Sequence, residues 1–308
     1  MNVQVLNVEK YETEAIDPVD YIDEWLMFKD AKTRSDYRRG IEKFIHWNKD
    51  ATPSPKRLNE YKHELILSGL KVNSINTYLA PVKDFFGWLY ESSYTGNDPS
   101  KGLTRVKHQD TNKINKAREL TDEEINKLFS MTSKATLKDH CDRLYLLLIF
   151  NLGLRNSEAL GLKVSDLELD EGHVSILGKG SKRRTLGIND LLREELIEYL
   201  KGMTVLTGED FIIQSSYFKS GKVNTKRAAN NHGHRIIKKY ADMAGLEDVK
   251  THSGRVTAIN ILLNSEVSTR DVANFAGHSS VSTTMVYDRK DVKRTVQVTK
   301  MIEIGKEK

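Results

Sequence analysis

The sequence predicts a mainly helical protein of two domains, with a small antiparallel β-sheet in the second domain. Its 308 residues exceed the length of one average domain. Apolar residues recur at helical spacing through residues 16–105, whereas short segments of alternating polarity appear between residues 164 and 188. No proline follows Pro99, so helices in the second half meet no break of that kind.

Four amphipathic helices are expected in the first domain. Asp17 and Pro18 are the residue types that favour a helix N-cap and the first helical position. A second helix is expected from about Thr33, a third from Ser54–Pro55 and a fourth from about Ser74. Helices with one apolar face each and short connections predict a small bundle. The apolar residues of the four faces are Tyr21, Ile22, Trp25 and Phe28; Tyr37, Ile41, Phe44 and Ile45; Leu58, Tyr61 and Leu65; and Ile75, Leu79, Val82, Phe85, Phe86 and Leu89.

The domain boundaries follow changes in composition. Residues 106–118 are polar and basic, which predicts a linker between a helical domain at residues 16–105 and a second domain at residues 119–290. Residues 1–15 show no periodicity and are expected to form a loose N-terminal tail. Residues 291–308 are expected to form a C-terminal tail.

The second domain begins with a helix-start signal and combines helices with short strands. Thr121–Glu124 has the spacing of a capping box, and Gly153 is suited to end the apolar helix expected across residues 137–152. Turn residues at 170–172 and 178–182 separate three segments of alternating polarity, which predicts an antiparallel sheet. The strands are expected at residues 164–169, 173–177 and 184–188, and further helices at 189–200, 225–244, 252–264, 268–275 and 282–287.

Composition excludes several classes of function. Hydrophobic residues make up 38% and charged residues 30% of the chain, as in soluble globular proteins. The longest apolar run, Leu144–Phe150, is too short to span a bilayer, and the polar N-terminus lacks a signal-peptide core. We therefore expect a cytoplasmic protein without a membrane partner. The single cysteine, Cys141, excludes an internal disulfide and a cysteine-rich zinc site, and the net charge of +5 permits a polyanionic partner.

Six side chains with phosphate-binding or nucleophilic chemistry stand near predicted turns and helix ends of the second domain. His252 and Arg255 are three residues apart on one helical face, and His278 precedes Tyr287 by nine residues. Taken singly, each has a structural explanation: an arginine pairs with a nearby carboxylate, a turn lysine is exposed, and a histidine after a glycine caps a helix. The full set is Arg155, Lys179, His252, Arg255, His278 and Tyr287.

This ordered set resembles the tyrosine recombinase, or phage integrase, family. The resemblance includes a Leu-Arg-x-Ser-Glu box at Leu154–Glu158, a Gly-Lys-Gly hairpin at Gly178–Gly180, and a His-x-x-Arg box at His252–Arg255. A Gly-His-Ser box with its later tyrosine follows at Gly277–Tyr287. The first domain is similar to the family's core-binding domain, down to the ending Asn97–Pro99, so the resemblance covers nearly the whole chain.

The resemblance implies covalent chemistry on DNA. Tyr287 would be the nucleophile that attacks the scissile phosphodiester, leaving a 3′-phosphotyrosyl link and a free 5′-hydroxyl. Lys179 would protonate the leaving 5′-oxygen. Because the phosphotyrosine stores the bond energy, neither a nucleotide nor a metal is required. The sequence accordingly has no Walker loop and no His/Cys zinc box, and we expect no cofactor.

The resemblance also assigns the remaining site residues. Arg155 and Arg255 would hold the non-bridging phosphate oxygens, a role suited to permanently charged guanidinium groups. His252 would assist proton transfer, and His278 would hydrogen-bond the phosphate or orient the site. Glu158 would support the site by positioning a basic neighbour.

The expected partner is double-stranded DNA that carries a short inverted-repeat site, clamped between the two domains. The family implies a homotetramer on two such sites, a monomer or weak dimer without DNA, and a location in the cytoplasm with the nucleoid. The C-terminal tail would dock on a neighbouring protomer. Basic residues expected to contact DNA, each with an alternative as ordinary solvated surface, are Arg34, Arg38, Arg39, Lys43, Lys71 and Lys182.

Some features depart from the family pattern and leave alternatives open. Gly254 stands where the family often has leucine, and Val256 where it often has histidine or serine. Their box resembles that of Cre, which has tryptophan at the place of His278. No arm-binding domain is expected before Tyr21. A type IB topoisomerase or hairpin telomere resolvase shares the chemistry, and a non-catalytic DNA-binding protein of the same fold is the other alternative.

Overall fold

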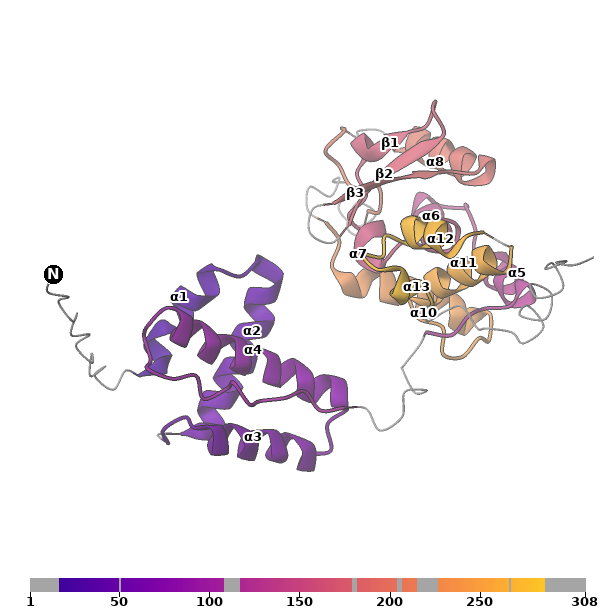
Figure 1. Ribbon diagram of the computed structural model, residues 1–308. Helices are drawn as coiled ribbons and strands as arrows, with labels where there is room; N and C mark the ends of the chain where they lie inside the picture. Colours follow the sequence, from indigo (N-terminus) through magenta and orange to yellow (C-terminus); the bar gives the residue numbers. More distant parts are fainter. Residues whose placement is uncertain are drawn as a thin grey trace, which may run out of the picture. The chain divides into compact units, whose positions relative to one another are not determined.

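The computed structural model describes residues 17–49, 51–107, 117–178, 182–203, 207–214, 227–265 and 267–285, and all structural statements concern these residues. The chain divides into two units, Met1–Ile114 and Asn115–Lys308 (Figure 1). In the described ranges both units are mainly helical, and the second contains a three-stranded antiparallel sheet. The predicted fold class is confirmed. No helix in these ranges is both long and apolar enough to cross a membrane.

The first unit is a bundle whose helices begin at identifiable caps. The Asp17 side chain accepts a hydrogen bond from the Val19 amide, and Ser54 caps the third helix by accepting from the Arg57 amide. The second helix begins two residues before the expected Thr33, because the carboxylate of Asp30 accepts from the Thr33 amide at 3.0 Å. The helices are η1 (Pro18–Tyr21), α1 (Ile22–Met27), α2 (Ala31–Asn48), α3 (Pro55–Leu67) and α4 (Val72–Glu91).

Aromatic side chains fill the centre of this bundle. Trp25 is fully buried, and its indole Nε1 donates to Asp84 at 2.8 Å while its ring packs on Phe85 at 5.0 Å. The expectation that Phe28 faces inward is wrong: this residue is 70% exposed. Helix α1 ends at Met27, so Phe28 leaves the helical register that its spacing suggested.

The segment that follows the bundle packs against it over more residues than the sequence indicates. Leu103 is buried in the bundle core. The Asn76 side chain donates to the Val106 carbonyl at 3.0 Å and accepts from the Val106 amide at 2.9 Å. The first residue of the linker expected at 106–118 is thus held against α4 by a pair of hydrogen bonds.

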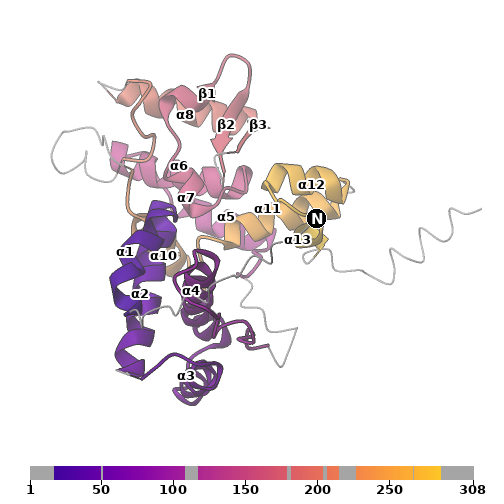
Figure 2. The same ribbon diagram turned by 60° about the vertical axis from the view of Figure 1, so that its left-hand side comes forward.

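The second unit is built around helix α6. From His140 to Phe150 nearly every side chain of α6 is buried. In both views the sheet and α8 lie on one side of α6, with α5, α10 and α11 on the other (Figures 1 and 2). The helices are α5 (Asp122–Ser130), α6 (Leu137–Asn151), α7 (Asn156–Ala159), η2 (Val164–Asp166), α8 (Asp190–Gly202), α10 (Asn230–Met243), α11 (Ser253–Asn264), α12 (Thr269–Ala276) and α13 (Val281–Met285).

The sheet has the order β1-β2-β3 and is antiparallel throughout. Its strands are β1 (Leu167–Glu168), β2 (His173–Leu177) and β3 (Arg183–Gly187), with Val174 opposite Leu186. The strand expected from residue 164 is wrong over its first three residues, which form η2. There the Asp166 carboxylate accepts from the Lys163 amide at 3.0 Å and closes a helical turn.

A matched pair of glycine substitutions tests the packing of α2 on α4. A Cβ at Gly40 would lie 2.3 Å from Pro81 Cγ, whereas a Cβ at Gly87 meets nothing within 4 Å. Overpacking should outweigh the gain in helix propensity, so Gly40→Ala should lower the unfolding free energy by about 1–2 kcal/mol. Gly87→Ala should raise it by roughly 0.5–1 kcal/mol.

Unfolding of the first unit can be followed by tryptophan fluorescence, because Trp25, Trp47 and Trp88 all lie in it. A Gly40→Ala protein as stable as the parent chain would contradict the close approach of the two helices.

Candidate active site

The site begins where α6 ends. Gly153 has φ +56°, and a Cβ there would lie 2.9 Å from the Phe275 ring, so this turn requires glycine. Arg155 follows and precedes α7. Its amide donates to Glu158 Oε2 at 3.0 Å and its Nη1 donates to Glu158 Oε1 at 2.8 Å, while 36% of its side chain stays exposed.

Glu158 is buried between two arginines. Arg184, on β3, donates from Nη1 to Glu158 Oε1 at 3.2 Å and from Nη2 to Oε2 at 3.0 Å. Burial alone would raise the pKa of Glu158, but the hydrogen bonds from Arg184 and Arg155 and the charge of Arg184 hold it below its ordinary value. The carboxylate is therefore ionised and paired.

Arg184 is the residue of this site that the sequence reasoning missed. Its Nε donates to the Phe275 carbonyl at 3.0 Å, and only 14% of its side chain is exposed. A signal was present: Arg184 shares strand parity with Leu186, which is buried, while Arg183 lies on the opposite face. An arginine on the inward face of a strand requires a buried partner.

Arg255 lies on α11 and is fully buried. Its Nη1 donates to the Gly153 carbonyl at 2.7 Å, and its Nη2 donates to the Ala276 carbonyl. Arg155 contacts the same helix end, donating to the carbonyls of Ala276 at 3.5 Å and Gly277 at 3.3 Å. Guanidiniums thus converge on the carboxyl end of α12, where the helix dipole favours positive charge.

The end of α12 places His278 beside these guanidiniums. Gly277 has φ +61°, and the His278 amide donates to the Ala273 carbonyl at 2.9 Å, which closes a Schellman-type cap. A Cβ at Gly277 would lie 2.9 Å from Arg184 Nη1. His278 Nδ1 and the hydroxyl of Thr284, on α13, are 2.7 Å apart.

Both imidazoles of the site are held neutral. Burial and then the charges of Arg255 and Arg155 lower the pKa of His278 to about 4. The same causes, in the same order, lower the pKa of His252. A neutral imidazole can accept a proton from a nearby hydroxyl at neutral pH.

The structure brings together most of the residues expected in the site. Arg155, Glu158, Arg255 and His278 meet at the end of α12, and His252 lies close enough to Arg255 and Arg155 for their charges to lower its pKa. Tyr287 and Lys179 lie outside the described residues, so their roles stay predictions. The DNA contacts expected of the basic residues likewise stay predictions.

Several of the expected DNA-contact residues have partners within the protein. Arg38 pairs with Asp23, Arg39 pairs with Asp36, and the Lys43 ammonium lies 4.6 Å from the centroid of the Tyr78 ring. Arg34 donates to the Leu26 carbonyl at 3.1 Å. Lys71 and Lys182 are exposed.

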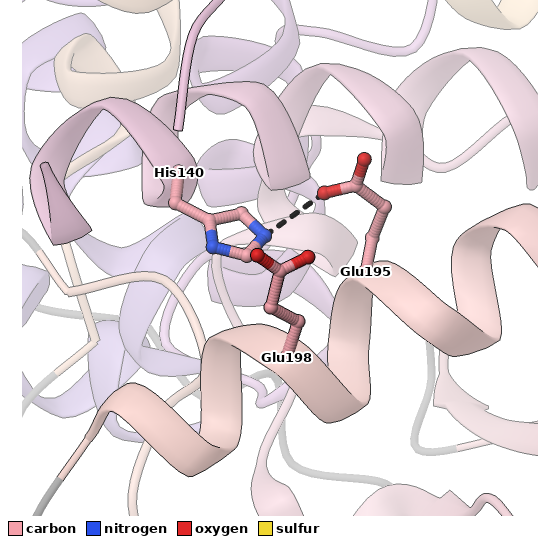
Figure 3. A group of neighbouring side chains, drawn as sticks. All are labelled: His140, Glu195 and Glu198. Atoms are coloured by element: carbon pink, nitrogen blue, oxygen red, sulfur yellow. Dashed lines mark hydrogen bonds and ion pairs between the residues drawn. The ribbon is translucent and has the colours of Figure 1, made fainter. Parts of the chain in front are cut away.

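One group in the described part of the chain has ligand types for a metal ion: His140, Glu195 and Glu198 (Figure 3). His140 Nε2 lies 2.9 Å from Glu195 Oε2. Arg143 donates to the other oxygen of Glu195 at 2.9 Å, and Lys134 pairs with Glu198 at 2.5 Å. Because these cations already compensate the carboxylates, the group is an ion-pair network that joins α6 to α8.

Comparison with known proteins agrees with this geometry. Residues 118–294 match the phage integrase family, and residues 26–93 match the phage integrase N-terminal SAM-like domain. The tyrosine recombinase XerC of Thermodesulfovibrio yellowstonii is 28% identical over 269 residues, which cover 85% of this chain and 87% of XerC.

Solved structures share the fold. The XerH site-specific recombinase in a post-cleavage complex with its palindromic difH substrate has a TM-score of 0.69 at 20% identity, covering 86% of this chain and 78% of XerH. A lambda integrase tetramer bound to a Holliday junction has a TM-score of 0.65 at 16% identity, covering 87% of this chain and 76% of the integrase.

The low pKa of His278 predicts how protonation couples to stability. The unfolded chain, with an imidazole pKa of about 6.5, binds more protons than the folded chain between that pH and pH 4. The stability due to neutral His278 should be complete above about pH 6.5 and lost as the pH falls toward 4. Histidine ring NMR, assigned with His278→Gln, should give a folded midpoint near pH 4; a midpoint near 6.5 would contradict the buried, cationic environment.

The crowding at Gly277 is testable against a second left-handed helix end. Gly277 and Gly245 have φ +61° and +62°, but a Cβ at Gly245 meets only Lys127 Nζ, at 3.8 Å. Backbone strain should lower the unfolding free energy of both alanine variants by about 1–2 kcal/mol. Gly277→Ala should lose roughly 1 kcal/mol more, because Arg184 must move. Urea unfolding followed by circular dichroism measures both losses; equal losses would show that Arg184 does not pack there.

Proposed function

The chain belongs to the phage integrase family of tyrosine recombinases, and from this premise we propose that it cuts and rejoins DNA at specific sites through a 3′-phosphotyrosyl intermediate. The observation that carries the proposal is the convergence of Arg155, Arg255 and His278 at the carboxyl end of α12. Positive charge fixed before substrate arrives can stabilise the charge that builds on a phosphodiester during its cleavage.

The two arginines differ in how they would act. Arg155 keeps part of its side chain exposed and is suited to contact a non-bridging phosphate oxygen directly. Arg255 is buried and tied to two carbonyls, so its contribution is a permanently fixed charge beneath the site. Neither needs to reorganise during the reaction.

The remaining steps use groups that the family pattern supplies. The Tyr287 hydroxyl attacks phosphorus as its proton passes to a neutral imidazole of the site, and the bond from phosphorus to the 5′-oxygen breaks. Lys179 supplies the proton to that oxygen. Attack of a 5′-hydroxyl on the phosphotyrosine reverses the step and rejoins the strand, so no external energy source enters.

The assembly is proposed by analogy with the solved relatives. XerH is bound to a palindromic site, and the lambda integrase forms a tetramer on a Holliday junction. We infer that this chain acts on short inverted repeats as a homotetramer in the cytoplasm, with residues 16–105 as a core-binding domain and residues 119–290 as the catalytic domain. The tail at 291–308 would dock on a neighbouring protomer.

The experiment is a covalent trap. Duplexes selected from a random library for binding to the protein are labelled, incubated with it in EDTA, and quenched with detergent. The wild-type chain should form a protein–DNA adduct even in EDTA, because the attack requires no metal. The DNA ends of the adducts should converge on an inverted repeat. Tyr287→Phe should abolish the adduct, whereas Tyr90→Phe, which removes an exposed phenol of the first unit, should leave it unchanged.

The same trap separates the rival functions. Binding without any adduct from the wild-type chain would favour a non-catalytic DNA-binding protein. Adduct formation that relaxes supercoiled DNA without exchanging strands between two sites would favour a topoisomerase.

A further inference from the structure

We propose that Arg184 is a positioning residue of the cleavage reaction, which holds the phosphate-binding groups and the base of the β2–β3 hairpin in one fixed arrangement. The inference rests on the proposed function and deepens it. Arg184 is the second residue of β3, and its guanidinium lies beside three separate segments of the second unit.

The first contact fixes Arg155. The Glu158 carboxylate accepts hydrogen bonds from Arg184 Nη1 at 3.2 Å and from Arg184 Nη2 at 3.0 Å. It also accepts from the Arg155 side chain at 2.8 Å and from the Arg155 amide at 3.0 Å. A carboxylate shared by two guanidiniums sets the distance and the plane of each. Loss of Arg184 would leave Glu158 free to rotate toward Arg155 or to take up a proton.

The second contact fixes the end of α12. Arg184 Nε donates to the Phe275 carbonyl at 3.0 Å, two residues before the glycine that redirects the chain to His278. The guanidinium also lies against Gly277, so tightly that a Cβ there would be 2.9 Å from Nη1. The position of His278 therefore depends on Arg184 through both the carbonyl and the packing surface.

The third segment beside Arg184 is the base of the hairpin. The Gly178 amide donates to the Lys182 carbonyl at 2.8 Å and closes the turn. A Cβ at Gly178 would lie 3.6 Å from Arg184 Nη1 and 4.0 Å from Glu158 Oε1. The residue that precedes Lys179 in the chain thus lies next to the same ion pair that orients Arg155.

Charge compensation alone would be a simpler role for Arg184, and the two roles predict different results. A compensating cation would affect stability and leave the cleavage rate of the folded protein unchanged. A positioning residue would affect the rate of adduct formation while DNA binding stays the same, because binding draws on many contacts and cleavage on the alignment of a few groups.

The test measures single-turnover adduct formation and DNA affinity on the duplex identified by the covalent trap. Arg184→Met should slow adduct formation about 100-fold, and Arg184→Lys, which keeps the charge but not the planar fork, about 10-fold. Neither should change DNA affinity appreciably. Arg183→Met is the matched control, because Arg183 is adjacent on β3 but pairs with Asp166 and Ser175 on the other face; its rate should equal that of the wild type.

A substrate with a sulfur at the bridging 5′ position identifies which group Arg184 serves. A thiolate leaves without a proton, so this substrate should restore cleavage by Lys179→Ala. It should not restore Arg184→Met, in which Arg155 and His278 are also displaced. Full rescue of Arg184→Met would overturn the claim that Arg184 positions Arg155 and His278. Arg184 would then act only through the hairpin that carries Lys179.

The remaining outcomes are also decisive. If the wild-type chain forms no adduct, the proposed function fails. If the wild type cleaves and Arg184→Met matches its rate, only the positioning role fails. Should Arg184→Met not fold, Arg184→Lys and the double variant Arg184→Met with Glu158→Gln carry the test, and wild-type rates in both would overturn the proposal.

Discussion

The candidate site depends on one electrostatic constraint, the gathering of guanidiniums at the carboxyl end of α12. Arg155, Arg184 and Arg255 donate to the final carbonyls of this helix, and Glu158 supplies one carboxylate against their three charges. The negative end of the helix dipole and the Glu158 carboxylate offset the repulsion among the three guanidiniums before substrate binds. The excess of positive charge favours an anion, and a DNA phosphate meets that requirement.

Three glycines allow the backbone to approach closely around the guanidinium cluster. Gly153 and Gly277 have positive φ and sit against Phe275 and Arg184, where a side chain would collide. Gly254 lets α11 approach α6, since a Cβ there would lie 3.0 Å from the Ile149 carbonyl oxygen. Glycine at this position thus allows α11, which carries Arg255, to lie close to α6.

Local signals made much of the structure predictable. Helix caps such as Thr121, and the order of the boxes that contain Arg155, Arg255 and His278, could be read directly from the chain. Strand parity with Leu186 indicated that Arg184 faces inward, but its role could not be predicted, because its partners Glu158 and Phe275 are distant in sequence and meet it only in the folded chain. The strand expected at residue 164 failed for a local reason, a side-chain cap that competes with strand pairing.

Hydrogen exchange at the arginine Nε–H groups of the DNA-free protein tests the central claim most directly. Assigned by arginine-to-lysine substitution, the Nε–H signals of Arg184 and Arg255 should exchange far more slowly than that of Arg39, whose side chain is 65% exposed. Slow exchange at both would show that the guanidinium cluster exists before DNA binds. Exchange of both at the rate of Arg39 would contradict a preformed site.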